Sequence, residues 1–198
     1  MTHSEKDSIS EETSADLCGK LLIAMPSMGD PRFEKSVIYM CAHGQEGSMG
    51  LILNKPSDEV KFTQLLKQLK ITHISRDHEP AVHFGGPVEM GRGFVLHSPE
   101  YHADDGMIAV DEDFSMSATL DVLRDIAAGT GPERSILALG YSGWGEGQLE
   151  NEILANGWLT CDATPDLVFN TVPEDQWVAA LHSLGVDPMM LSVSAGHA

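Results

Sequence analysis

Positive charge is scarce in this chain. Only 12 of its 198 residues are Lys or Arg, against 30 Asp or Glu, so the formal net charge is −18. After Arg134 the last 64 residues contain no Lys or Arg, whereas they contain eight acidic residues. Proteins hold phosphate backbones by neutralising them with Lys and Arg, so this balance argues against direct contact with DNA or RNA, and against acidic membrane surfaces. Basic proteins, cationic ligands and divalent metals are electrostatically compatible partners.

Cysteines and long apolar runs are also scarce. The three cysteines, at positions 18, 41 and 161, are widely spaced and form no C-x-x-C pair, which predicts free thiols in a reducing cytosol. Apolar runs such as Leu21–Met25 fall far short of the ~18–20 residues of a membrane helix. Residues 1–16 are polar and acidic and lack the pattern of a secretory signal. We therefore expect a cytoplasmic protein with a disordered acidic tail over 1–16.

Residues 17–198 have the length of one globular domain. Apolar runs predict strands over Lys20–Met25, Val37–Cys41, Met49–Asn54, Ala81–Phe84, Gly93–His97, Met107–Val110, Ile136–Leu139, Trp158–Cys161 and Leu167–Asn170. Helical periodicity predicts helices over Phe62–Leu69, Ser117–Ala128 and Gln148–Asn156, and a last helix that opens on the capping-box spacing of Thr171–Glu174. Strands outnumber helices and come in consecutive runs, which favours an α+β fold over a regular βαβ repeat.

The most distinctive segment is Gly140–Ile153, in which four glycines fall within eight residues. It follows the predicted strand Ile136–Leu139 and runs into the predicted helix Gln148–Asn156, for which Gly157 is the expected stop. Glycine permits a left-handed backbone or a close approach by another segment. The pattern predicts a strand, a glycine turn and a helix. The turn either binds a ligand or only packs the helix against the sheet, with Trp144 covering the core.

Two enzyme motifs are close to this segment but incomplete. A nucleophile elbow reads G-x-S-x-G, whereas here Trp144 stands at the last glycine of Gly140-Tyr-Ser142-Gly-Trp144. A P-loop ends in Gly-Lys-Ser/Thr, whereas this segment has no lysine and three glutamates follow the turn. Neither a Ser142 nucleophile nor a phosphate cradle is well supported.

Other chemically capable residues lie on predicted strands. Cys41 and His43 are expected on one face, because alternate residues of a strand share a face, and His83 and His97 could approach them. A metal site would need these groups to converge on one ion, and two-residue spacing is too common to show that. We expect packing instead, with no metal and no cofactor. Arg92, between two glycines, could bind a carboxylate or stand in a surface hairpin.

Several separated motifs resemble the AlgH/YqgE family of bacterial proteins. They are Leu21–Pro26, Ser36–His43, Met49–Pro56, His83–Val88, Gly93–His97, Gly140–Glu150 and the closing Gly196–Ala198, and they follow the family order over about residues 17–198. Two departures occur. Ser48 stands where the family usually has Ala, and Cys161–Pro165 replaces a loop that usually reads Pro-Ala-Asp.

The resemblance implies a single α+β domain with a flattened, barrel-like mixed β core and helices packed outside. It implies no agreed catalytic residues, and the family name reflects a proposed role in transcriptional regulation. The residues that match the family motifs, together with Ser142, mark a candidate surface for a ligand or partner: Cys41, His43, Asn54, Gly85, Gly86, Arg92, His97, Ser142, Gly143, Trp144, Gly147, Gln148 and Glu150.

Three functional hypotheses follow. The first is a non-enzymatic cytoplasmic module that binds a protein or small molecule and affects transcription only indirectly. The second is a hydrolase-like enzyme that uses the glycine segment with Ser142, Cys41 or a histidine, and it requires these groups to converge in one pocket. The third is a direct DNA-binding regulator, which the net charge of −18 disfavours.

Overall fold

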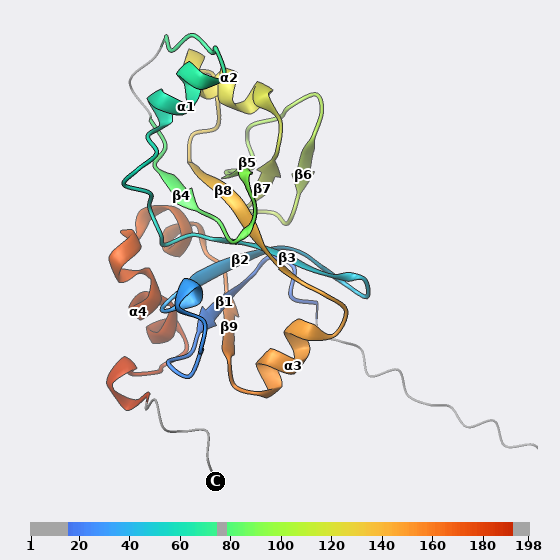
Figure 1. Ribbon diagram of the computed structural model, residues 1–198, viewed down its shortest axis with the longest axis vertical. Coiled ribbons are helices and arrows are strands. Elements are labelled where there is room, and N and C mark those ends of the chain that lie inside the picture. The colour runs from blue at the N-terminus through green and yellow to red at the C-terminus, as the bar shows by residue number, and fades with distance from the viewer. Residues whose placement is uncertain (1–15, 75–78, 192–198) are drawn as a thin grey trace, which may run out of the picture.

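The computed structural model describes residues 16–74 and 79–191 (Figure 1). Nine strands form one curled sheet in the order β6-β7-β5-β8-β3-β2-β1-β9, and β4 lies parallel to β8 beside it. The strands are β1 Lys20–Ala24, β2 Val37–Gly44, β3 Gly47–Ile52, β4 Val82–Phe84, β5 Val88–His97, β6 Met107–Ala109, β7 Ser115–Ser117, β8 Ser135–Trp144 and β9 Trp158–Asp162. The predicted tail, apart from Asp16, and the closing Gly196–Ala198 lie outside the described residues.

Helices surround this half-barrel, which confirms the α+β class and the barrel-like core. They are α1 Phe62–Gln68, α2 Leu120–Ala128, α3 Gln148–Leu154 and α4 Pro173–Ser183, with short 3-10 helices η1 Pro31–Phe33 and η3 Pro188–Met190 and a π-helix η2 Asp166–Asn170. Figure 1 shows α1 and α2 together at one end of the molecule and α3 toward the other end. The longest strands, β5 and β8, pair along much of their length.

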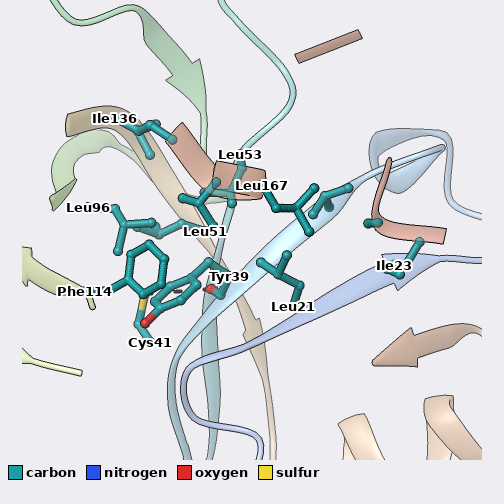
Figure 2. Close-up of a cluster of buried hydrophobic side chains, with 14 of the residues drawn as sticks. Leu21, Ile23, Tyr39, Cys41, Leu51, Leu53, Leu96, Phe114, Ile136 and Leu167 are labelled. Carbon is teal, nitrogen blue, oxygen red and sulfur yellow. Dashed lines mark hydrogen bonds between the residues drawn. The ribbon is translucent and has the colours of Figure 1, made fainter. Parts of the chain in front are cut away.

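Alternation along the central strands builds two apolar layers. Leu21 and Tyr39 point into the half-barrel, where they pack with Phe114 in the cluster of Figure 2. Leu22 and Ile38 point to the opposite face and pack under α3. A third cluster joins α1 and α2 to the outer side of β5 and β8. Both faces of the central strands are therefore buried, which explains their continuous apolar runs.

Glycines allow two backbones to cross closely beside β8. Gly86, with φ of 152°, passes against the backbone of Tyr141, so that any β-carbon there would overlap it. Gly85 is similarly crowded by the carbonyl oxygen of Gly140, and Gly140 by the carbonyl oxygens of Gly86 and Val88. The Gly85 amide donates to Leu139 O and the Gly85 carbonyl accepts from the Ile52 amide, at 2.8 and 2.9 Å. These glycines are therefore required by the crossing of the chain between β4 and β5 over β8.

The strand before α3 is longer than the sequence indicates. The apolar run predicted a strand ending at Leu139, but β8 continues to Trp144 because β3 pairs with its last residues. Gly140–Trp144 is therefore strand, and only Gly145–Gly147 is turn. The run Leu167–Asn170, predicted as a strand, is the π-helix η2, whose start is fixed by a Thr164 side-chain bond and which packs near α4. A short apolar run does not distinguish a strand from a buried helix.

Helix ends also differ from prediction. The last helix starts at Pro173 with Val172 at the N-cap and no side-chain cap, so the predicted capping box is wrong. The third helix closes on Asn156, which adopts a left-handed φ of 57°, and not on Gly157. Ser117 belongs to β7, so α2 begins later than predicted, at Leu120. Gly129 ends α2 in the left-handed conformation, which glycine adopts readily.

Candidate functional site

The open end of the half-barrel forms a hollow of about 600 Å³, which we call the mouth. Its apolar lining comes from six strands. Cross-strand partners share a face, and Ile108 pairs with Met116, which pairs with the inward-facing Leu96. The lining residues used below are Met49, Phe94, Ile108, Met116 and Tyr141. The folding of the sheet therefore leaves an apolar cavity at the ends of the strands.

Charged side chains stand at the edge of the mouth. The Arg92 guanidinium lies 5.1 Å from the centre of the Phe94 ring and 3.6 Å from the carboxylate of Glu89. Glu46 borders the hollow from the β2–β3 hairpin. Phe94 in turn meets Tyr141 edge to face at 5.8 Å between ring centres. Arg92 is thus held over the Phe94 ring and beside Glu89.

The glycine segment reaches the mouth only in part. Gly143 borders the hollow, and a β-carbon there would lie 3.2 Å from the Tyr141 ring, which is a tight contact. Trp144 also borders it, but its indole points to the other face and packs edge to face on Trp158. Of the predicted surface, the structure therefore gathers Arg92, Gly143 and Trp144 around one cavity.

Gln148 and Trp144 belong to a hydrogen-bond network that fixes α3. Glu152 accepts bonds from the indole nitrogens of Trp144 and Trp158, at 3.0 and 2.8 Å, on one carboxylate oxygen. Its other oxygen accepts from the Gln148 amide at 2.9 Å, and Gln148 caps the turn by accepting from Gly145 N. These contacts attach α3 to the sheet. Sequence analysis did not identify Glu152, because nothing in the local pattern shows that the indoles on either side of α3 turn toward its carboxylate.

His43 also joins α3 to the sheet. Its Nδ1 lies 2.8 Å from Ser48 Oγ, and its Nε2 lies 3.5 Å from a carboxylate oxygen of Glu150. Ser48 borders the mouth. Because Ser48 pairs with Trp144 across β3 and β8, its hydroxyl is directed toward His43 on the α3 side of β3. The three groups adjoin as in a catalytic triad, except that Nδ1 meets the hydroxyl and Nε2 meets the carboxylate. The imidazole and the carboxylate lie on the α3 side of β3.

The expectation that Cys41 and His43 share a face is wrong. The β2–β3 register shifts between Met40 and Ala42, and this bulge inserts one residue into β2. One inserted residue reverses the faces of the side chains that follow it. Cys41 therefore lies in the interior cluster of Figure 2, while His43 turns toward Glu150. Burial raises the pKa of the Cys41 thiol, which makes it unreactive.

The remaining candidate nucleophile and histidines lie apart from one another. Ser142 is buried, and its hydroxyl donates to Gly85 O at 3.4 Å. His97 is buried between Ser117 Oγ and Ser98 O, at 3.0 and 2.9 Å. His83 is paired with Ala81 O. Desolvation lowers the pKa of both His83 and His97. Within residues 16–74 and 79–191, no three His, Cys, Asp or Glu side chains are grouped as metal ligands.

Asn54 has a structural role. Its side-chain oxygen accepts from Val37 N at 2.9 Å, and its amide donates to Lys35 O at 2.8 Å. Lys35 itself has a left-handed φ of 50°. Asn54 therefore secures the entry to β2, and with Gly85 and Gly86 it belongs to the scaffold beneath the sheet and not to the mouth.

A larger hollow, of about 870 Å³, lies between the end of α2 and η2. Arg134 stacks on Phe169 beside it, at 5.3 Å from the ring centre. None of the residues predicted as a functional surface lines this cavity. The mouth is therefore the better candidate site.

Fold and mouth together define a class: a one-domain α+β protein with a half-barrel sheet that is hollow at one end. The AlgH-like family model matches residues 21–189, and the chain belongs to that family. A UPF0301 protein of Jannaschia sp. (strain CCS1) is 58% identical over 184 residues, covering 92% of this chain and 96% of the relative. Another, from Ruegeria pomeroyi, is 59% identical over 184 residues, covering 92% and 100%.

Solved structures agree with this assignment. The AlgH protein from Pseudomonas aeruginosa has a TM-score of 0.74 and 41% identity, over 96% of this chain and all of that one. A Corynebacterium diphtheriae protein has a TM-score of 0.70 over 93% and 94% of the two chains, and at 21% identity it shows the fold alone. None of the helices in the described part of the chain is long and apolar enough to span a membrane.

Proposed function

We propose that this protein is a non-enzymatic binding module that holds a protein segment or small molecule in the mouth. The observation that carries the proposal is the cavity itself. Residues of six strands converge on one apolar hollow with few polar groups at its edge. Ligand sites are typically of this kind, and the open ends of β-barrels are among their common positions.

The hydrolase alternative has weaker support. Ser142 and Cys41 are buried with backbone carbonyls as partners, and neither is paired with a histidine among the described residues. The Ser48–His43–Glu150 group has the right side chains and Ser48 borders the mouth, but its hydroxyl is directed toward His43 on the α3 side of β3. Hydrolysis of a p-nitrophenyl ester that is lost in Ser48→Ala would favour the enzyme over the binding module.

Any regulatory effect is proposed to be indirect and to arise in the cytoplasm. All three cysteines are free thiols, which fits a reducing compartment. The net charge of −18 opposes contact with phosphates. Titration with duplex DNA at about 50 and 200 mM salt tests this, because phosphate binding weakens steeply over that range. We expect no binding at either salt concentration, and salt-sensitive binding would contradict the proposal.

A thermal-shift screen of metabolites, run beside a cytosolic pull-down, tests the binding function. A ligand that raises the melting temperature binds the folded state preferentially. We expect Ile108→Asp, which places a charge in the mouth, to abolish the shift of any true ligand. Leu154→Asp is the matched control, because Leu154 is an exposed apolar residue on the far side of α3. Ligands whose shifts are equal in both variants would show that the mouth is not the site.

A further inference from the structure

One edge of the sheet borders the mouth. β6 is the terminal strand and pairs only with β7 in the described sheet. Its central residue, Ile108, has an exposed fraction of 54% and also lines the mouth. Open sheet edges present unpaired backbone groups to which another chain can pair. An inference from this edge rests on the proposed binding function and specifies its partner.

The backbone of β6 is oriented for such pairing. Val110 N donates to Phe114 O at 3.0 Å, and Ala118 N donates to Gly106 O at 3.3 Å, so both of these opposed pairs are hydrogen-bonded. Hydrogen-bonded pairs alternate along an antiparallel ladder. Ile108 and Met116 are therefore also bonded to each other, and the amide and carbonyl groups of Met107 and Ala109 point away from β7 toward the open edge.

Acidic side chains surround this apolar edge. Two exposed acids precede β6 and three follow it in the turn to β7: Asp104, Asp105, Asp111, Glu112 and Asp113. Glu46 also borders the mouth, as does Glu89, which is paired with Arg92. A segment that lies along β6 therefore meets apolar side chains at its centre and negative charge at both ends.

We propose that the mouth binds an extended segment of a partner protein, which adds to β6 as a further strand and carries apolar residues at alternate positions with Lys or Arg at its ends. Alternate side chains of an added strand point to one face, so they enter the mouth beside Ile108. Hydrogen bonds from the backbone of the added segment to Met107 and Ala109 supply affinity. The acidic residues around β6 favour a segment with Lys or Arg at its ends.

A second copy of this chain is a poorer occupant of the edge. Pairing of two β6 strands would bring two sets of five acids together, and each molecule carries a net charge of −18. Like charges juxtaposed at an interface disfavour binding. The charge around the edge thus fits a basic segment of a different protein.

Synthetic nonapeptides test the charge requirement. The probe is fluorescein-labelled KKVTVTVKK, and the control is EEVTVTVEE with the same apolar pattern. We expect the basic peptide to bind at least about ten-fold more tightly at low salt and to weaken as salt is added. We also expect it to slow amide hydrogen exchange at Met107 and Ala109. Equal binding of the two peptides, no detectable binding, or unchanged exchange at both amides would overturn strand addition.

A variant pair tests the backbone contact. Ala109→Pro removes an outward-facing amide at an edge position where proline is tolerated, whereas Ala109→Val retains it. Loss of one such bond should raise the dissociation constant of the basic peptide by about ten-fold in the proline variant alone. Circular dichroism and unfolding curves check that both variants fold. Equal affinities in two folded variants would refute the pairing.

The outcomes separate this inference from the function on which it rests. If peptides fail but Ile108→Asp abolishes the shift of a small ligand, strand addition is wrong and the binding function stands. If sedimentation shows a dimer that Ala109→Pro disrupts, the edge belongs to a second copy and the inference is also wrong. If neither peptides nor small ligands respond to Ile108→Asp, both proposals fail.

Discussion

Single residues in this protein act mainly through the scaffold. Gly86 combines a φ of 152° with a backbone contact to Tyr141 that excludes any β-carbon. Gly91 has open space around its α-carbon and no left-handed φ, so it is a matched control. The family motif that contains Gly86 is thus accounted for by chain crossing, without a ligand.

We expect Gly86→Ala to lower the free energy of unfolding by about 2–6 kcal/mol, from backbone strain and steric overlap together. The free energy of unfolding of Gly91→Ala should be close to that of the unmodified protein. Urea unfolding of both variants measures the difference. If Gly86→Ala is insoluble while Gly91→Ala folds, the comparison still supports the crossing, whereas equal stabilities would contradict it.

Burial of His97 predicts a pH dependence of stability. Desolvation lowers the pKa of the folded-state imidazole, and the carbonyl of Ser98 opposes this only in part. In the unfolded chain the pKa of this imidazole is about 6.5, so as the pH falls the unfolded chain binds the proton before the folded chain does. The contribution of His97 to the free energy of unfolding is therefore fully present above this pH and decreases below it. The contribution reaches at most about 1.4 kcal/mol per pH unit for one group.

Urea unfolding between pH 7.5 and 5.5 checks this expectation. His97→Gln removes the titrating group, so the slope of stability against pH should be smaller in the variant. His83 has a lowered pKa for the same reason and should contribute in both proteins. Identical slopes would mean that His97 does not stay neutral in the fold.

At the scale of elements, the attachment of α3 depends on Glu152. One of its oxygens accepts both indole bonds. Glu152→Ala leaves the buried Trp144 and Trp158 nitrogens without a partner, and a lost buried partner costs about 1–3 kcal/mol. We expect a loss of roughly 2–4 kcal/mol in chemical unfolding, and a smaller loss in Glu152→Gln, which keeps one acceptor oxygen. Glu146→Ala, an exposed position in the preceding turn, should be neutral.

Strands with continuous apolar runs could be predicted from the sequence, whereas features that depend on residues remote in the sequence could not. The strands around Leu21 and Val37 follow from their local pattern. The continuation of β8 to Trp144 depends on pairing with β3, which is remote in sequence. The bulge in β2 reverses His43 with no local signal, and the π-helix after Thr164 is decided by packing near α4.

The candidate site was predicted only in fragments for the same reason. Arg92 and Gly143 were identified from local motifs, but the apolar lining of the mouth was not. Met49, Ile108 and Met116 are ordinary strand residues in the sequence, and they meet because the sheet curls. Curling depends on the pairing of all the strands, so no local pattern indicates the cavity.

At the scale of the whole molecule, negative charge dominates. The net charge of −18 is spread over 198 residues, and the ion pairs that the structure describes have at least one partly exposed partner. Exposed pairs contribute little and are screened by salt. Repulsion among like charges, in contrast, opposes the compact state throughout the molecule and is also screened. These two effects of salt have opposite signs.

We expect repulsion to prevail, so that the melting temperature at pH 7.5 rises by a few degrees between about 10 and 300 mM NaCl. Near the isoelectric point of about 4.6 the net charge vanishes, and the same salt step should have little effect. Sodium chloride is preferred to sulfate, which strengthens apolar burial by itself. Scanning calorimetry at both pH values measures the two increments. A melting temperature that falls with salt at pH 7.5 would mean that attractive pairs outweigh repulsion.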